Sequence, residues 1–174
     1  MSGHSAWRLL ALLLVLRPLA DAGAQGIAPG IAAPEIDLPT LLGGRVRLSA
    51  LRGHPVVVTF WGTWCPPCRG EFPELVAAYR KYGAAGLEVL AVNQSDQELN
   101  TTDVQTFVRE HAVEFIVLLD SRGKARRSFR LIALPTTVFV DATGITQLVH
   151  SGPISRAELA RGLATILPPK ERLP

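Results

Sequence analysis

The strongest constraint on the fold is an uninterrupted run of strand-forming residues that leads straight into a helical pattern. Residues 55–61 read PVVVTFW, a β-branched and aromatic run typical of a strand buried on both faces of a sheet. From Pro66 to Tyr82, apolar residues recur at helical spacing, and a proline suits the first helical turn. Pro73 lies inside this pattern and is expected to kink the helix. A buried strand followed at once by a helix predicts an α/β fold.

The remainder of the chain continues to alternate between strands and helices. Apolar runs predict strands at residues 87–92, 115–119, 136–140 and 145–149, and two short strands at 35–38 and 45–48 that form a hairpin around LLGG. The last two of the longer strands flank DATG, which indicates another hairpin. The predicted core is therefore a central mixed β-sheet flanked by helices on both faces.

Sequence patterns also mark where the later helices begin. Thr102 with Gln105 predicts a capping box at the start of one helix, and Ser155 with Glu158 predicts another at the start of the last. A shorter helix is expected at residues 122–129. Five basic side chains gather in this region, and we interpret them as a solvated helix face rather than a docking patch for an acidic partner. They are Arg122, Lys124, Arg126, Arg127 and Arg130.

The first residues resemble an export signal. A positive charge at Arg8 precedes the apolar run LLALLLVL at residues 9–16, and small residues follow. The run is shorter than the ~20 residues that a membrane-spanning helix needs, so a cleaved signal peptide is favoured over an uncleaved anchor. Export would place the protein in the periplasm or cell envelope. The predicted organisation is a signal peptide at 1–24, a linker at 25–34, one domain at 35–168 and a tail at 169–174.

Composition excludes several classes of function. The 174 residues are 48% hydrophobic and 19% charged, so a folded domain is expected rather than a disordered chain. A net charge of +3 gives no case for nucleic-acid binding, which usually requires a strong basic stripe. A domain of this size buries enough surface without a disulfide. The only two cysteines, Cys65 and Cys68, therefore need an explanation other than stability.

The Cys-Pro-Pro-Cys motif at residues 65–68 is open to three interpretations. A structural zinc site would need four ligands, but the chain has no other cysteine and its histidines are scattered. A purely structural disulfide would close a very short loop and would restrain little entropy in the unfolded state. A redox dithiol at the start of a helix, after a buried strand, explains the spacing best. This interpretation requires neither a metal nor an organic cofactor.

The two cysteines are expected to have different roles. Cys65 lies at the predicted helix N-terminus, where the helix dipole and free N–H groups favour a thiolate, and it should be the exposed nucleophile. Cys68 lies one turn into the helix and should be the buried thiol that resolves the mixed disulfide. Pro66 and Pro67 cannot donate hydrogen bonds to the Cys65 sulfur. A strongly depressed thiol pKa, which would make a powerful oxidant, is not expected, so the pair should donate electrons.

The segments FWGTWCPPCRGEFPEL and ALPTTVFVDATG together resemble the thioredoxin superfamily. Within it, the chain is similar to the TlpA/ResA-like periplasmic thiol-disulfide oxidoreductases, which include the CcmG branch. The resemblance covers about residues 33–167 and includes the N-terminal β-hairpin that this group adds to the thioredoxin-like fold. It implies an enzyme that reduces disulfides of envelope proteins, such as apocytochrome c during cytochrome c maturation or a copper-assembly protein. It also implies a membrane electron donor of the thiol-transfer type.

The resemblance further implies which residues contact the partner protein. Pro135 matches the family's cis-proline, which faces the cysteines. Leu134 matches the preceding residue, which contacts the partner backbone. Trp64 is expected to form a surface platform beside Cys65, and Pro66 and Pro67 are expected to contact substrate next to it.

Proton transfer is the last role that the resemblance assigns. Glu71 matches an acidic residue that assists proton transfer in ResA-like members, and it follows Cys68 by three residues on the same helix face. An ordinary surface glutamate in the first helical turns is the alternative. Thr59 stands where ordinary thioredoxins carry a buried aspartate, and a threonine cannot exchange a proton at neutral pH. This difference favours Glu71 as the residue that handles the proton.

Two other functions stay open from the sequence. An oxidising or isomerising thiol enzyme would use the same dithiol at a higher reduction potential. A copper-binding chaperone would use the two thiols as soft ligands and would need a third ligand near them, where the sequence offers no histidine.

Overall fold

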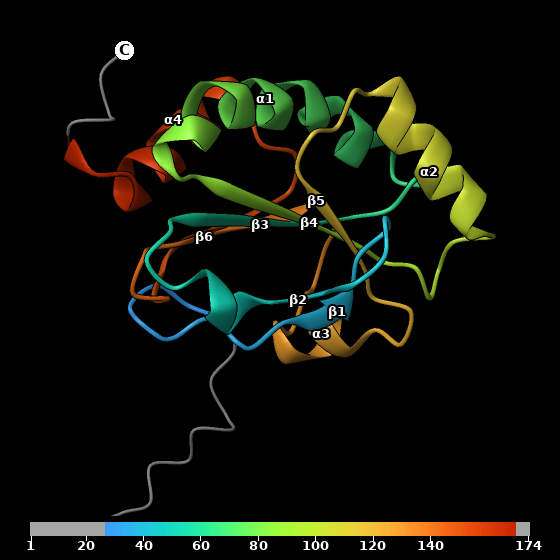
Figure 1. The fold of residues 1–174 in the computed structure, drawn as a ribbon, viewed down its shortest axis with the longest axis horizontal. Coiled ribbons are helices and arrows are strands. Elements are labelled where there is room, and N and C mark those ends of the chain that lie inside the picture. The colour runs from blue at the N-terminus through green and yellow to red at the C-terminus, as the bar shows by residue number, and fades with distance from the viewer. Residues whose placement is uncertain (1–26, 170–174) are drawn as a thin grey trace, which may run out of the picture.

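The described part of the chain, residues 27–169 of a computed structural model, is organised around a five-stranded sheet (Figure 1). The strands lie in the order β5-β4-β3-β6-β7; β3, β4 and β5 are parallel, and β6 and β7 are antiparallel to their neighbours. Their bounds are Val56–Trp61 for β3, Glu88–Asn93 for β4, Ile116–Leu119 for β5, Thr136–Val140 for β6 and Thr146–Ser151 for β7. The predicted mixed sheet is confirmed, with strand ends displaced by one or two residues.

The side chains of the central strand β3 alternate between two cores. Val57 and Trp61 face one core, whereas Val58 and Phe60 face the other, and none of the four is more than 1% exposed. The helices are α1 (Pro66–Tyr82), α2 (Thr101–Glu110), α3 (Lys124–Ser128) and α4 (Arg156–Ile166), with short 3-10 turns at Leu48–Leu51 and Gly83–Ala85. α1 and α4 cover one face of the sheet and α3 lies on the opposite face (Figure 1). This double coverage explains why PVVVTFW is apolar at nearly every position.

The predicted N-terminal hairpin is present as a small separate sheet. Strands β1 (Asp37–Pro39) and β2 (Arg45–Arg47) pair antiparallel. Beyond β1, Thr40 forms a bridge with Leu118 of β5, so the hairpin is attached to the edge of the main sheet. An attached hairpin covers strand edges that would otherwise be free to pair with another chain.

The chain before the hairpin is also held against the sheet. Within the predicted linker, the Gly30 N–H donates to the Thr146 carbonyl at 2.8 Å, and the Ala33 N–H donates to the Gly144 carbonyl at 3.0 Å. The predicted signal peptide at 1–24 and the tail from residue 170 onward lie outside the described residues. Among residues 27–169, no helix has the length and apolar character needed to cross a membrane.

The start of α2 differs from the prediction. The capping box of Thr102 with Gln105 is wrong, because Asn100 is the N-cap and its side chain accepts a hydrogen bond from the Asp103 N–H at 3.0 Å. Asparagine is at least as effective an N-cap as threonine. The cap therefore lies two residues earlier, and Thr102 falls inside the first turn of the helix.

The capping box predicted for the last helix is found where expected. At the start of α4, the Ser155 side chain accepts from the Glu158 N–H, and the Glu158 carboxylate accepts from the Ser155 N–H at 2.8 Å, which confirms the capping box. α1 contains Pro73 and continues through it to Tyr82, and the kink expected at this proline stays a prediction. Proline has no N–H to donate at this position, so α1 lacks one internal hydrogen bond yet stays helical because its apolar face is packed on the sheet.

Gly162 allows α4 to approach the sheet closely. A Cβ at this position would lie 2.2 Å from Cζ of Phe139, whose ring is fully buried in β6. We expect Gly162→Ala to lower the free energy of unfolding by about 1–3 kcal/mol, because a buried ring cannot move aside without strain. Urea unfolding measures the loss.

Gly70→Ala in α1 is the matched control, because its added methyl meets nothing within 4 Å, and it should be neutral or slightly stabilising. Equal stability of Gly162→Ala and the native protein would contradict the close packing.

Candidate active site

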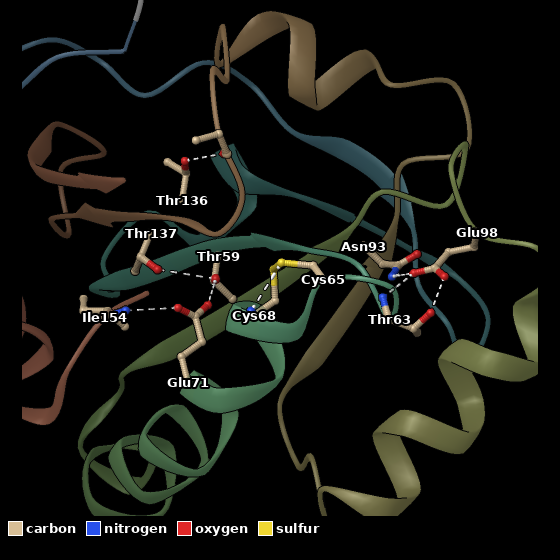
Figure 2. Close-up of a disulfide and its surroundings, with 11 residues drawn as sticks. Thr59, Thr63, Cys65, Cys68, Glu71, Asn93, Glu98, Thr136, Thr137 and Ile154 are labelled. Carbon is tan, nitrogen blue, oxygen red and sulfur yellow. Dashed lines mark hydrogen bonds between the residues drawn. A yellow bond between two sulfur atoms is a disulfide. The ribbon is translucent and has the colours of Figure 1, made fainter. Parts of the chain in front are cut away.

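The two cysteines meet where β3 ends and α1 begins. They form a disulfide with an S–S distance of 2.03 Å (Figure 2). Cys65 is the N-cap of α1, and its sulfur accepts a hydrogen bond from the Cys68 N–H at 3.3 Å. Pro66 and Pro67 occupy the first two positions of the helix and have no N–H to donate. The sulfur of Cys65 thus receives a bond from the helix end, but the two residues that follow it add none.

Cys65 is more buried than the sequence predicts. It was expected to be the exposed nucleophile, yet only 5% of its surface is accessible, against 0% for Cys68. In this disulfide form its sulfur is tied to Cys68 and both residues belong to the core beneath α1. Cys65 is more accessible than Cys68, as predicted. However, a partner disulfide has to bind in the groove beside Cys65 to reach its sulfur.

A groove of about 440 Å³ gives access to Cys65. Trp64 stands on its rim with 48% of its surface exposed. The opposite wall comes from the segment before β6, where the Leu134–Pro135 peptide bond is cis, as the resemblance implies. Pro135 is buried behind Leu134 and does not line the groove itself. The lining residues are Trp64, Cys65, Pro66, Pro67, Gln97, Arg126, Leu131, Ile132, Ala133 and Leu134.

Glu71 is buried, which contradicts the alternative of an ordinary surface glutamate. It is 1% exposed, and its carboxylate accepts hydrogen bonds from Thr59 Oγ1 at 2.9 Å and from the Ile154 N–H at 3.4 Å. Thr137 Oγ1 in turn donates to Thr59 Oγ1 at 3.4 Å (Figure 2). Burial raises the pKa of Glu71 to about 7, and the hydrogen bonds from Thr59 and Ile154 oppose this rise. A carboxyl that titrates near neutral pH therefore follows Cys68 by three residues on α1.

Sequence reasoning missed a second acidic side chain at the site. Glu98, from the loop between β4 and α2, accepts hydrogen bonds from the Thr63 N–H at 2.7 Å, from the Thr63 hydroxyl and from Asn93 Nδ2 at 2.7 Å (Figure 2). These contacts hold the turn that leads into Cys65. Glu98 is 35 residues from Thr63 in the chain, so no local pattern could have shown the contact. The sequence holds only an indirect signal for this contact. Parallel pairing of β3 with β4 places Trp61 beside Asn93, so the residues that follow the two strands, Thr63 and Glu98 among them, lie at the same edge of the sheet.

The chemistry that this arrangement supports is exchange between a dithiol and a disulfide. The Cys65–Cys68 disulfide lies at a helix N-terminus beside an open groove, and Glu71, whose pKa is raised to about 7, lies on the same helix. Cysteine sulfur in such a position can attack another disulfide as a thiolate. Within residues 27–169, no cluster of three or more histidine, cysteine, aspartate or glutamate side chains is placed to hold a metal ion.

Comparison with known proteins agrees with this geometry. The model of the AhpC/TSA family matches residues 29–149, which is well over half of the chain. The chain belongs to the AhpC/TSA family. The matched span includes the hairpin, both cysteines, Glu71 and the cis-proline, whereas Ile154, which donates to Glu71, lies just beyond it.

Individual relatives specify the activity of this AhpC/TSA protein. The thiol-disulfide oxidoreductase ResA of Geobacillus kaustophilus is 33% identical, over 82% of this chain and 80% of its own. A candidate thiol:disulfide interchange protein DsbE from Chlorobium tepidum is 32% identical with a TM-score of 0.73, over 80% of this chain and 97% of that one. A secreted disulfide oxidoreductase of Mycobacterium tuberculosis is 25% identical with a TM-score of 0.67, over 75% and 96% of the two chains. The protein thus has a thioredoxin-like fold and is a thiol-disulfide oxidoreductase.

Proposed function

We propose that the protein acts in the periplasm or cell envelope as a reductant of disulfides in partner proteins. The direction of electron transfer is inferred from the hydrogen bonds to the Cys65 sulfur. This sulfur accepts one from the Cys68 N–H, whereas Pro66 and Pro67 have no N–H to donate. A cysteine pair is strongly oxidising when its reduced form, with a thiolate, is stabilised relative to the disulfide. A thiolate with few hydrogen-bond donors lacks that stabilisation, so this pair gives up electrons more readily.

The reaction proceeds in two exchange steps. In the first, the Cys65 thiolate attacks one sulfur of the partner disulfide; a Cys65–partner bond forms, the partner S–S bond breaks, and one partner thiolate leaves. In the second, Cys68 attacks the Cys65 sulfur and releases the other partner thiolate. Two electrons pass to the partner, and the Cys65–Cys68 disulfide seen in the structure is the product form.

Glu71 takes the proton of Cys68 in the second step of this proposal. Cys68 is fully buried, so its thiol needs a nearby base to become a nucleophile. The pKa of Glu71, raised to about 7 by burial, is suited to accepting a proton and returning it near neutral pH. Figure 2 shows the Glu71 carboxylate pointing toward Thr59, on the side of α1 that also carries Cys68.

The proposed partners follow from the resemblance to TlpA/ResA-like proteins. They are envelope proteins with oxidised cysteine pairs, either apocytochrome c or a copper-assembly protein. A membrane electron donor of the thiol-transfer type returns the Cys65–Cys68 disulfide to the reduced state. Export by the predicted signal peptide would bring the domain to this compartment, and the Mycobacterium tuberculosis relative is described as secreted.

The reduction potential of the Cys65–Cys68 pair tests whether the protein reduces or oxidises its partners. We expect a value near that of thioredoxin, about −270 mV, because few donors stabilise the reduced form. Equilibration in glutathione buffers, followed by alkylation of free thiols and mass spectrometry, measures the fraction reduced. A potential near that of the strong periplasmic oxidant, about −120 mV, would contradict the proposal and support an oxidising enzyme.

A further inference from the structure

We infer that the groove over Cys65 continues onto an arginine-lined surface at α3, and that it receives partner segments that carry acidic side chains next to their disulfide. The inference rests on the proposed function, because it specifies the substrate class of the same dithiol. We call the surface formed by Arg126, Arg127, Arg130 and Leu131 the arginine surface. Its three arginines belong to the basic cluster that the sequence alone suggests is a solvated helix face, and the inference departs from that interpretation.

The arginine surface is continuous with the groove. It forms a shallow, widely open hollow of about 450 Å³. Two of its four residues, Arg126 and Leu131, also line the groove over Cys65. A chain segment that leaves the Cys65 sulfur along this wall therefore passes directly over the arginine side chains.

The connection between the two hollows is held in place. The Leu131 N–H donates to the Arg126 carbonyl at 3.1 Å, and the Arg130 N–H donates to the Arg127 carbonyl at 3.0 Å. Phe129 anchors the segment in the core on this face of the sheet, where its fully buried ring lies 4.9 Å from that of Phe60. The arginine surface and the groove wall are therefore one preformed unit, which lowers the entropy cost of binding an extended segment.

The chain segment that forms this unit is basic. The stretch from Ser121 to Val140 contains five basic residues and no acidic one. Arg127 and Arg130 are exposed. Arg126 is half-buried and pairs with Asp96 at 3.0 Å, and together with Leu131 it lines the wall that the two hollows share. Like charges gathered along a hollow raise the local concentration of oppositely charged groups. The arginine surface thus favours aspartate and glutamate side chains on the segment that crosses it.

The other side of the site has a different character, which orients the partner. Beyond Trp64, a separate hollow is lined by Asp103 and Glu110 together with Arg69. In the groove over Cys65, Ile132 is 92% exposed and offers an apolar contact. A partner segment therefore fits best with apolar residues beside its disulfide and acidic residues on the α3 side. Repulsion by Asp103 and Glu110 disfavours the reversed orientation.

Two internally quenched peptides test the inference. In each, a fluorophore half and a quencher half are joined by one disulfide; one peptide carries three aspartates beside it and the other carries three asparagines. We expect the reduced protein to cleave the acidic peptide about threefold to tenfold faster, with the ratio falling toward one as salt is raised. In R127Q/R130Q, the ratio of the cleavage rate of the acidic peptide to that of the asparagine peptide should fall about threefold to tenfold, to near one.

K81Q/R161Q is the matched control, because it removes the same amount of charge from α1 and α4, on the opposite face of the sheet. Its ratio should equal that of the native protein. If the native protein cleaves both peptides equally, or if K81Q/R161Q lowers the ratio as much as R127Q/R130Q does, the inference is overturned while the proposed reductase function stands. If the native protein cleaves neither peptide, the proposed function fails and the inference falls with it.

Discussion

Replacing Cys68 by serine is expected to halt the enzyme at the mixed disulfide and to lower steady-state turnover at least about a thousandfold. The first attack is preserved, because Cys65 stays at the N-cap and receives its hydrogen bond from the backbone N–H of residue 68. The second step is lost, because a thiol held in the same helical turn acts at an effective concentration that millimolar external thiol cannot replace. Non-reducing gels and mass spectrometry of envelope extracts measure the trapped complexes and name the partner.

Cys65→Ser is the matched control for the trapping experiment. It removes the same number of thiols, yet it should capture no partner, because the remaining Cys68 is 0% exposed. Capture by Cys65→Ser instead of Cys68→Ser would reverse the two roles. Turnover by Cys68→Ser at the native rate would contradict a resolving role for Cys68.

The parts of the structure that could be predicted are those that depend on neighbouring residues. A strand buried on both faces has to be apolar at nearly every position. The apolar run at residues 55–61 therefore predicts β3 without any knowledge of the rest of the fold. The N-cap position of Cys65 follows from the prolines after it, which suit a first helical turn. Cys65 and Cys68 are brought together by this local geometry alone.

The parts that could not be predicted depend on contacts between distant residues. Helical spacing places Glu71 on the same side as Cys68, but its burial depends on Ile154, which is 83 residues away in the chain. The link between Thr63 and Glu98 spans 35 residues and likewise leaves no periodic trace. The groove beside Cys65 takes one wall from residues 131–134, which lie far along the chain. Local pattern therefore identified the reacting groups, while their environment required the tertiary structure.

Glu71→Gln is expected to remove a large part of the pH dependence of stability. The pKa of Glu71 in the folded protein is about 7 against an ordinary value of 4.5, so the folded state binds this proton more tightly than the unfolded state does. Its stabilising contribution is therefore fully present below pH 4.5 and is lost as the pH rises through about 7. At about 1.4 kcal/mol per pKa unit, the loss is about 3 kcal/mol. Urea unfolding at about pH 5 and about pH 8 measures it.

The glutamine variant should show little of this loss, because its neutral amide fills the same site without a charge to desolvate. The exposed Glu110→Gln is the control and should keep the native pH dependence. If Glu71 also takes the proton of Cys68, resolution of a preformed mixed disulfide near pH 7 should slow about a hundredfold in Glu71→Gln, and Glu71→Asp should restore part of the rate. A glutamine variant that resolves at the native rate, yet loses the pH dependence of stability, would restrict Glu71 to a buried structural carboxyl.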